Sequence, residues 1–98
     1  MLKKVVKFAK KEFREKKPTS GKVLRVKEAK RVSIGGPFPQ HVVKEPQDCH
    51  YVVLLDYGRN YRMYSFTRTG ILINGENVEK NSDKMRKLLK STKVEYKL

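Results

Sequence analysis

Two runs rich in β-branched and aromatic residues, Cys49–Leu55 and Tyr61–Thr67, stand out in the hydrophobic pattern of the chain. The first run is apolar at successive positions, which is typical of a strand that is covered on both faces. The segment between the runs contains Gly58 and Asn60, which tolerate a positive φ where a chain reverses. The pattern therefore predicts a β-hairpin over 49–68 in the middle of a sheet.

Two segments, one before and one after this hairpin, have apolar positions with helical spacing. Over residues 2–16 one stripe of an amphipathic helix is formed by Leu2, Val5, Val6, Ala9 and Phe13. Six cations all fall on the opposite side of that helix: Lys3, Lys4, Lys7, Lys10, Lys11 and Arg14. A second, shorter helix is predicted over about 82–90, because Ser82 and Asp83 form a capping signal before inward-facing Met85, Leu88 and Leu89.

Alternating segments predict the remaining strands. Residues 22–34 alternate except at Glu28 and Lys30, which indicates a bulge or an overhang of the strand beyond the sheet. Asn74–Gly75 has the composition of a tight turn between 71–73 and 76–78. Residues 93–98 alternate as an edge strand, with Val94, Tyr96 and Leu98 to one side. Glycines and prolines predict a long loop over 35–48.

These elements predict a single α+β domain. An N-terminal amphipathic helix is followed by a mostly antiparallel sheet of four or five strands around the central hairpin. The second helix and the C-terminal edge strand complete the order.

The charge is the dominant feature of the composition. The 98 residues carry a formal net charge of +14. Residues 1–31 hold thirteen Lys and Arg against three Asp and Glu, so this third of the chain accounts for +10. A polyanion is the simplest partner for such a chain, and nucleic acid is the commonest polyanion. An acidic protein and an anionic membrane surface are the alternatives.

Several other classes of protein lack support in the sequence. Cys49 is the single cysteine, so no intramolecular disulfide forms, and no apolar run is long enough to span a membrane. The N-terminus does not have the pattern of a secretory signal. Spacing among His41, Asp48, Cys49 and His50 matches no zinc motif. We therefore expect a cytoplasmic, soluble protein with no metal, no cofactor and no transmembrane segment.

Aromatic and basic residues interleave along the predicted hairpin, combining π-faces for bases with cations for phosphates. We predict a nucleic-acid-binding surface formed by Lys3, Lys7, Lys10, Lys11, Arg14, Arg25, Lys27, Arg31, Arg59, Tyr61, Arg62, Tyr64 and Arg68. Tyr61 and Tyr64 are its candidate stacking residues. No residue is predicted to be catalytic.

Two resemblances bear on function. The run GRNYRMYSF at 58–66 is similar to the central strand of small basic ribonuclease toxins of toxin–antitoxin systems, which are also alike in size and charge. The element order resembles that of the double-stranded-RNA-binding domain. In that family a Gly-Pro-x-His loop joins the first two strands. Gly36, Pro37 and His41 lie in the corresponding connection here, with a different spacing. We transfer no functional residue from either family.

The leading hypothesis is therefore a nucleic-acid-binding protein that favours RNA over DNA and recognises phosphates and shape with low sequence specificity. One alternative is an inhibitor or adaptor of the phage or mobile-element type, which acts on an acidic protein through its basic surface. A second is a small ribonuclease of the toxin type, which would use the arginines and tyrosines of the hairpin.

Overall fold

This computed structural model contains two helices and five strands and describes residues 2–32 and 47–98, with side chains for 2–27 and 48–98. The elements are α1 (Leu2–Lys16), β1 (Ser20–Val32), β2 (Gln47–Asp56), β3 (Asn60–Phe66), β4 (Leu72–Glu79), α2 (Asp83–Lys90) and β5 (Thr92–Lys97). The strands form one antiparallel sheet in the order β4-β3-β2-β1-β5. The α+β prediction is confirmed. The loop predicted over 35–48 lies outside the described residues except at its end, where the prediction is wrong: residues 47 and 48 already belong to β2 and pair with β1.

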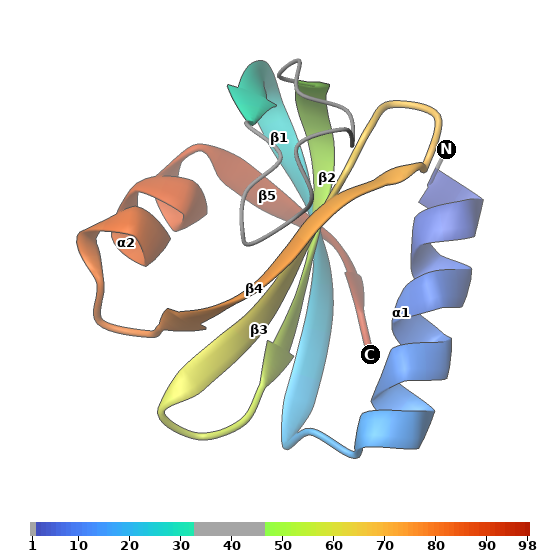
Figure 1. Ribbon diagram of the computed structural model, residues 1–98, viewed down its shortest axis with the longest axis vertical. Coiled ribbons are helices and arrows are strands. Elements are labelled where there is room, and N and C mark those ends of the chain that lie inside the picture. Colours follow the sequence, from blue (N-terminus) through green and yellow to red (C-terminus); the bar gives the residue numbers. More distant parts are fainter. Residues whose placement is uncertain (1, 33–46) are drawn as a thin grey trace, which may run out of the picture.

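The centre of the sheet is β2, as its continuous apolar run predicts. Val53 and Leu55 point to the face covered by α1, whereas Val52 and Leu54 point to the face covered by α2. All four side chains are fully buried. Figure 1 shows the two helices on opposite sides of the twisted sheet.

The apolar stripe of α1 packs over β1, β2 and β3. Val5 and Ala9 are 0% exposed at the centre of this contact. Phe8 meets the rings of Tyr64 and Phe66 edge-on, each with a centroid separation of 5.0 Å. At the C-terminal end of α1, Lys17 has a φ of 50° before Pro18, a left-handed residue that stops the helix. Because the apolar face of α1 packs on the sheet, its opposite, cationic face points to solvent.

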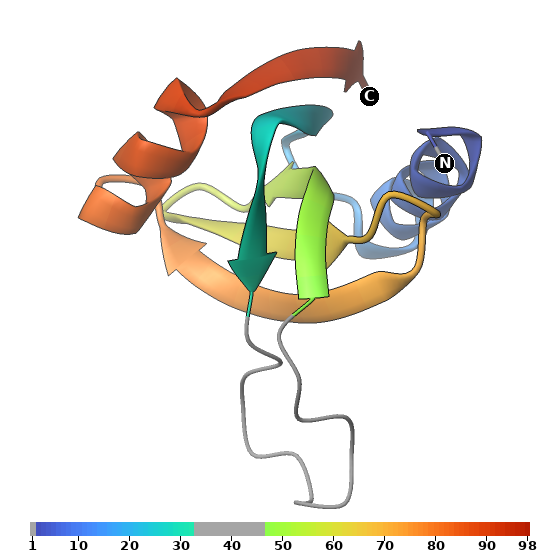
Figure 2. The same cartoon turned by 90° about the horizontal axis from the view of Figure 1, so that it is seen from above.

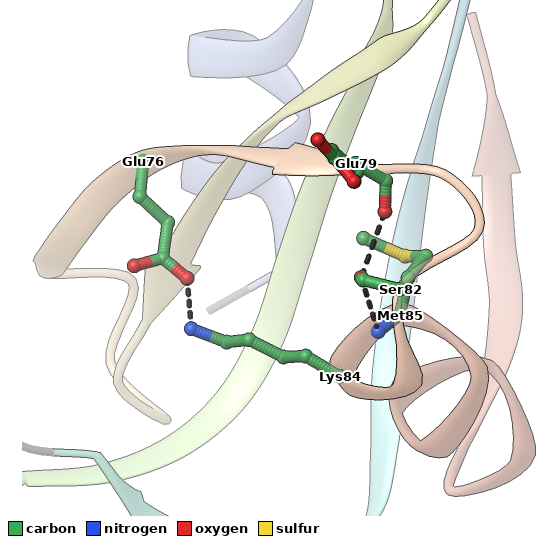
Figure 3. A network of polar contacts seen from close by, with 5 residues as sticks. All are labelled: Glu76, Glu79, Ser82, Lys84 and Met85. Carbon is green, nitrogen blue, oxygen red and sulfur yellow. Dashed lines mark hydrogen bonds and ion pairs between the residues drawn. The ribbon is translucent and has the colours of Figure 1, made fainter.

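The shorter α2 docks on the other face through Met85, which is fully buried, and half-buried Leu88. Leu89, also predicted to face inward, is 39% exposed and lies outside this cluster, because the short helix buries only one narrow stripe. Ser82 caps the helix: its hydroxyl accepts a hydrogen bond from the Met85 N–H at 3.2 Å and donates one to the Glu79 carbonyl at 2.8 Å (Figure 3). Seen from above, α2 connects the two edge strands, β4 and β5, at one end of the sheet (Figure 2). No helix among the described residues is both long enough and apolar enough to cross a bilayer.

The predicted bulge in the first strand is confirmed, because the pairing of β1 with β2 shifts register between Arg25 and Lys30. The turn predicted at Asn74–Gly75 is wrong, since β4 runs continuously through it. A Cβ at Gly75 would lie 3.0 Å from the Tyr64 ring. Glycine here therefore makes room for an aromatic side chain on the neighbouring strand, rather than reversing the chain.

The alternation predicted for the last strand also fails. Tyr96 pairs with Val23 and Val94 pairs with Leu24, and a register shift separates the two pairs. Val23 and Leu24 lie on opposite faces of the sheet. Residues opposite each other in a ladder share a face, so Tyr96 faces the side of α1 and Val94 the side of α2.

Candidate nucleic-acid interface

The outer face of α1 carries a continuous row of cations. Its members are all exposed: Lys3, Lys4, Lys7, Lys10, Lys11 and Arg14. At 1.5 Å per residue the row from Lys3 to Arg14 is about 16 Å long, and members three or four residues apart are neighbours. None of the six forms an ion pair with a described acid. No ion pair with a described acid therefore offsets their positive charge, and all six side chains are exposed to solvent.

β1 and β5 extend this surface beside the helix. Lys10 Nζ lies 5.2 Å from the centroid of the Tyr96 ring, which is 37% exposed, so α1 and β5 meet at this point. Arg25 is paired with Lys93 in the β1–β5 ladder, and both side chains are exposed. Arg25 Nη1 also lies 3.9 Å from Glu95 Oε1, which balances part of its charge.

We call the set Lys3, Lys7, Lys10, Arg14, Arg25, Lys93 and Tyr96 the α1–β5 surface. Tyr96 and Lys93 were not predicted as site residues. Strict alternation groups Tyr96 with Val94 and Leu98, whereas the register shift between β1 and β5 separates it from Val94 and places it on the α1 side, next to Lys10. The sequence signal that could have identified Tyr96 is its position between Glu95 and Lys97 on a short edge strand.

Lys27 belongs to a different part of the molecule. Its Nζ lies 3.5 Å from the carbonyl oxygen of Lys90, and its N–H donates to the Ser91 carbonyl at 2.9 Å. A cation at this position offsets the negative end of the α2 dipole. Lys27 therefore fastens β1 to the end of α2, whereas the side chain of Arg31 lies outside the described ones.

The cations of the hairpin are not gathered into one patch. Arg59 lies in the β2–β3 turn and Arg68 in the β3–β4 turn, at opposite ends of β3. Arg62 is half-buried, 5.2 Å from the Tyr64 ring centroid, with its Nη1 3.5 Å from Asn77 Oδ1. The hairpin thus presents separate cations to solvent at its two ends.

The two hairpin tyrosines contribute to packing. The Tyr64 ring is 8% exposed and packs beneath α1. Half-buried Tyr61 packs against the core on the α2 face, and Lys80 Nζ lies 5.2 Å from its ring centroid. Tyr57 in the β2–β3 turn is exposed, and its pKa is raised, first by desolvation and then by nearby Tyr64 and Glu12. A tyrosine with a raised pKa is protonated at neutral pH and is a poor general base.

The residues considered for metal binding show no grouping. The part of the chain that the structure describes contains no cluster of three His, Cys, Asp or Glu side chains that could hold an ion. His41 lies outside the described residues. Burial raises the pKa of the Cys49 thiol, which keeps the sulfur protonated and unreactive.

Comparisons with known proteins give no relative. No protein-family description, curated protein or solved structure matches this chain.

Proposed function

We propose that the protein binds nucleic acid through the α1–β5 surface, favouring RNA over DNA and reading phosphates and shape rather than sequence. The observation that carries this proposal is the row of six exposed cations on α1, four of which belong to this surface and none of which is paired with a described acid. Phosphate contacts of this kind supply most of the affinity of non-specific binding. We place this activity in the cytoplasm, where RNA is abundant.

Tyr96 supports a preference for single-stranded segments. A partly exposed ring next to a lysine can stack on an unpaired base while the ammonium contacts the adjacent phosphate. Bases inside a duplex are not accessible to such a ring, so single-stranded RNA should bind more tightly than duplex of equal length.

The test is a titration of fluorescent RNA at two salt concentrations with the variant Lys3→Gln/Lys7→Gln/Lys10→Gln/Arg14→Gln. Each lost phosphate contact should lower the slope of log K against log salt by about 0.7 on a single strand or about 0.9 on duplex. The four changes should therefore weaken binding alike for all sequences and reduce the slope by up to about 3 on a single strand.

The matched control removes the same number of cations from α2: Lys84→Gln/Arg86→Gln/Lys87→Gln/Lys90→Gln. The net charge falls equally, but the α1–β5 surface stays intact, so this variant should retain most of the affinity. Equal losses in both variants would mean that only the net charge matters, and would refute the assigned surface. Absence of RNA binding by the wild type at low salt would refute the proposed function.

An acidic protein is the second partner that the α1–β5 surface suits, since an unpaired basic row steers any polyanion. This is the inhibitor or adaptor hypothesis, a regulator of the mobile-element type. An acidic protein that stays bound after nuclease treatment, and is released by the α1 variant, would favour it. The ribonuclease hypothesis gains no support from the hairpin, where Tyr64 is in the core and Arg59 and Arg68 are far apart.

A further inference from the structure

A cavity of about 240 Å³ lies between α2 and the sheet, on the face opposite α1. Its apolar walls are formed by Val26, Val52, Met63 and Leu88. Cys49 and Ser65, which are 4% and 3% exposed, complete its interior. The remaining lining residues, Asn74, Glu76, Lys84, Lys87 and Ser91, are half-buried or exposed and form a polar rim.

The interior of this cavity suits an apolar group. Its polar atoms need no further partner: the Cys49 thiol lies 3.5 Å from the Tyr51 carbonyl oxygen, and none of the described residues that line the cavity has a buried side-chain nitrogen or oxygen without a hydrogen bond. A ligand therefore needs to supply no buried hydrogen bond there. An apolar cavity of roughly 150 Å³ is enough to bind benzene, so this one has room for a ring with a short chain, or for a medium-length alkyl chain.

The rim adds a charge preference. Lys84 is ion-paired with Glu76 across the gap between α2 and β4 (Figure 3), which balances both charges. Lys87, one helical turn further along, is exposed and forms no ion pair with a described acid. An unbalanced ammonium group therefore stands at the rim of an apolar interior.

We propose that this cavity binds a small molecule with an apolar body and a single carboxylate, such as a medium-chain or aromatic carboxylic acid. Its body packs against Val52 and Met63, and its carboxylate lies at Lys87. The cavity is smaller than the roughly 300–1,000 Å³ of sites for drug-sized ligands, which favours a ligand of this modest size. The sheet separates it from the α1–β5 surface, so the proposal is independent of nucleic-acid binding.

The probe is octanoate, followed by NMR of isotope-labelled methionine methyl groups. Met63 lines the cavity, whereas Met85 is buried in the same core without lining it, so the two signals distinguish occupancy from a general change. Octanoate should shift the Met63 signal saturably and the Met85 signal less. Acetate, which lacks the tail, should shift neither, and octanol, which lacks the charge, should bind several-fold more weakly.

Two variants test the assigned positions. Lys87→Gln should weaken octanoate binding by up to about five-fold, the upper end of the range for an exposed charge pair, and leave octanol unchanged. Lys90→Gln, which removes the same charge from α2 outside the cavity, should have no effect. Val26→Phe should fill the interior and abolish the Met63 shift, and Leu88→Phe on the opposite, α2 wall serves the same purpose if Val26→Phe does not fold.

Two results would contradict the proposal. Equal affinities for octanoate and octanol, with no effect of Lys87→Gln, would overturn the anionic ligand class. A Met63 signal that no probe shifts, or an octanoate shift that survives both filling variants, would overturn the site itself.

Discussion

At the scale of single residues, Asp56 at the end of β2 makes the best-defined polar contacts of the hairpin. Its Oδ1 accepts a hydrogen bond from the Gly58 N–H at 2.8 Å, and its Oδ2 accepts one from Lys80 Nζ at 2.6 Å. Gly58 has a φ of 94°, the left-handed conformation that the turn requires. Asp56 therefore fixes the β2–β3 turn and ties it to the segment before α2.

We predict that Asp56→Asn lowers the free energy of unfolding by about 1 kcal/mol at neutral pH, because Lys80 loses a partly buried partner while the shape of the side chain is kept. The Lys80 and Gly58 hydrogen bonds hold the pKa of Asp56 below its ordinary value. A group with a lowered folded-state pKa stabilises the protein above its unfolded value of about 3.9, and this contribution is lost as the pH falls through the folded pKa.

Urea unfolding from pH 7 to pH 2 measures this directly. The difference between the wild type and Asp56→Asn should be constant down to about pH 4 and then shrink. Glu15→Gln, which removes an exposed carboxylate from the same basic protein, controls for the general effect of added positive charge. A difference that persists unchanged at pH 2 would show that the Lys80 pair contributes nothing.

Residue identity alone does not reveal which aromatic rings are free. The alternation of Tyr61, Arg62 and Tyr64 is typical of a stacking surface, yet Tyr64 is buried because Phe8 of α1 lies against it. That contact joins residues distant in sequence. The role of Gly75 was missed for the same reason. The glycine leaves room for the Tyr64 ring, and the two residues meet only when β4 pairs with β3.

At the scale of elements, the helices were predictable because their signals are local. The stripe and cationic face of α1, and the Ser82 cap of α2, depend only on residues within a few turns. The faces of β5 were not predictable, because they depend on a register shift against β1, whose sequence is distant. The α1 part of the candidate surface therefore follows from sequence, whereas Lys93 and Tyr96 require the sheet order.

We predict that Ser82→Ala destabilises the protein by about 1 kcal/mol, because it removes the acceptor for the Met85 N–H at the first turn of α2. Since α2 covers one face of the sheet, its loosening should also expose the core around Met85. Thermal unfolding gives the overall effect, and amide exchange of α2 gives the local one.

Asn81→Ala is the control for this change, because exposed Asn81 is adjacent to the cap and its side chain forms no hydrogen bond among the described residues. It should leave both the stability and the exchange of α2 nearly unchanged. Equal effects of the two substitutions would assign the loss to the loop before α2 rather than to the cap.

At the scale of the whole molecule, the charge is distributed unevenly over the fold. Residues 1–31 hold +10 of the +14, and α1 presents its share on one outer face. Like charges held this close oppose folding, since the unfolded chain can separate them. A surface kept despite this cost is consistent with a polyanionic partner that relieves the repulsion when it binds.

The last prediction follows from that repulsion. Raising sodium chloride from about 0.01 M to about 0.15 M shortens the Debye length from about 30 Å to about 8 Å, so the wild type should gain stability, by up to about 1 kcal/mol. The α1 glutamine variant should start more stable than the wild type at low salt and gain less, since glutamine has nearly the helix propensity of lysine. Urea midpoints at the two salt concentrations provide the measurement.

The α2 glutamine variant is the control, and it should keep most of the salt response because the cations it removes lie partly in ion pairs with Glu76 and Asp83. Equal salt responses for the wild type and the α1 variant would mean that the cations of α1 are too far apart to repel one another appreciably, and would weaken the case that they form one phosphate-binding row.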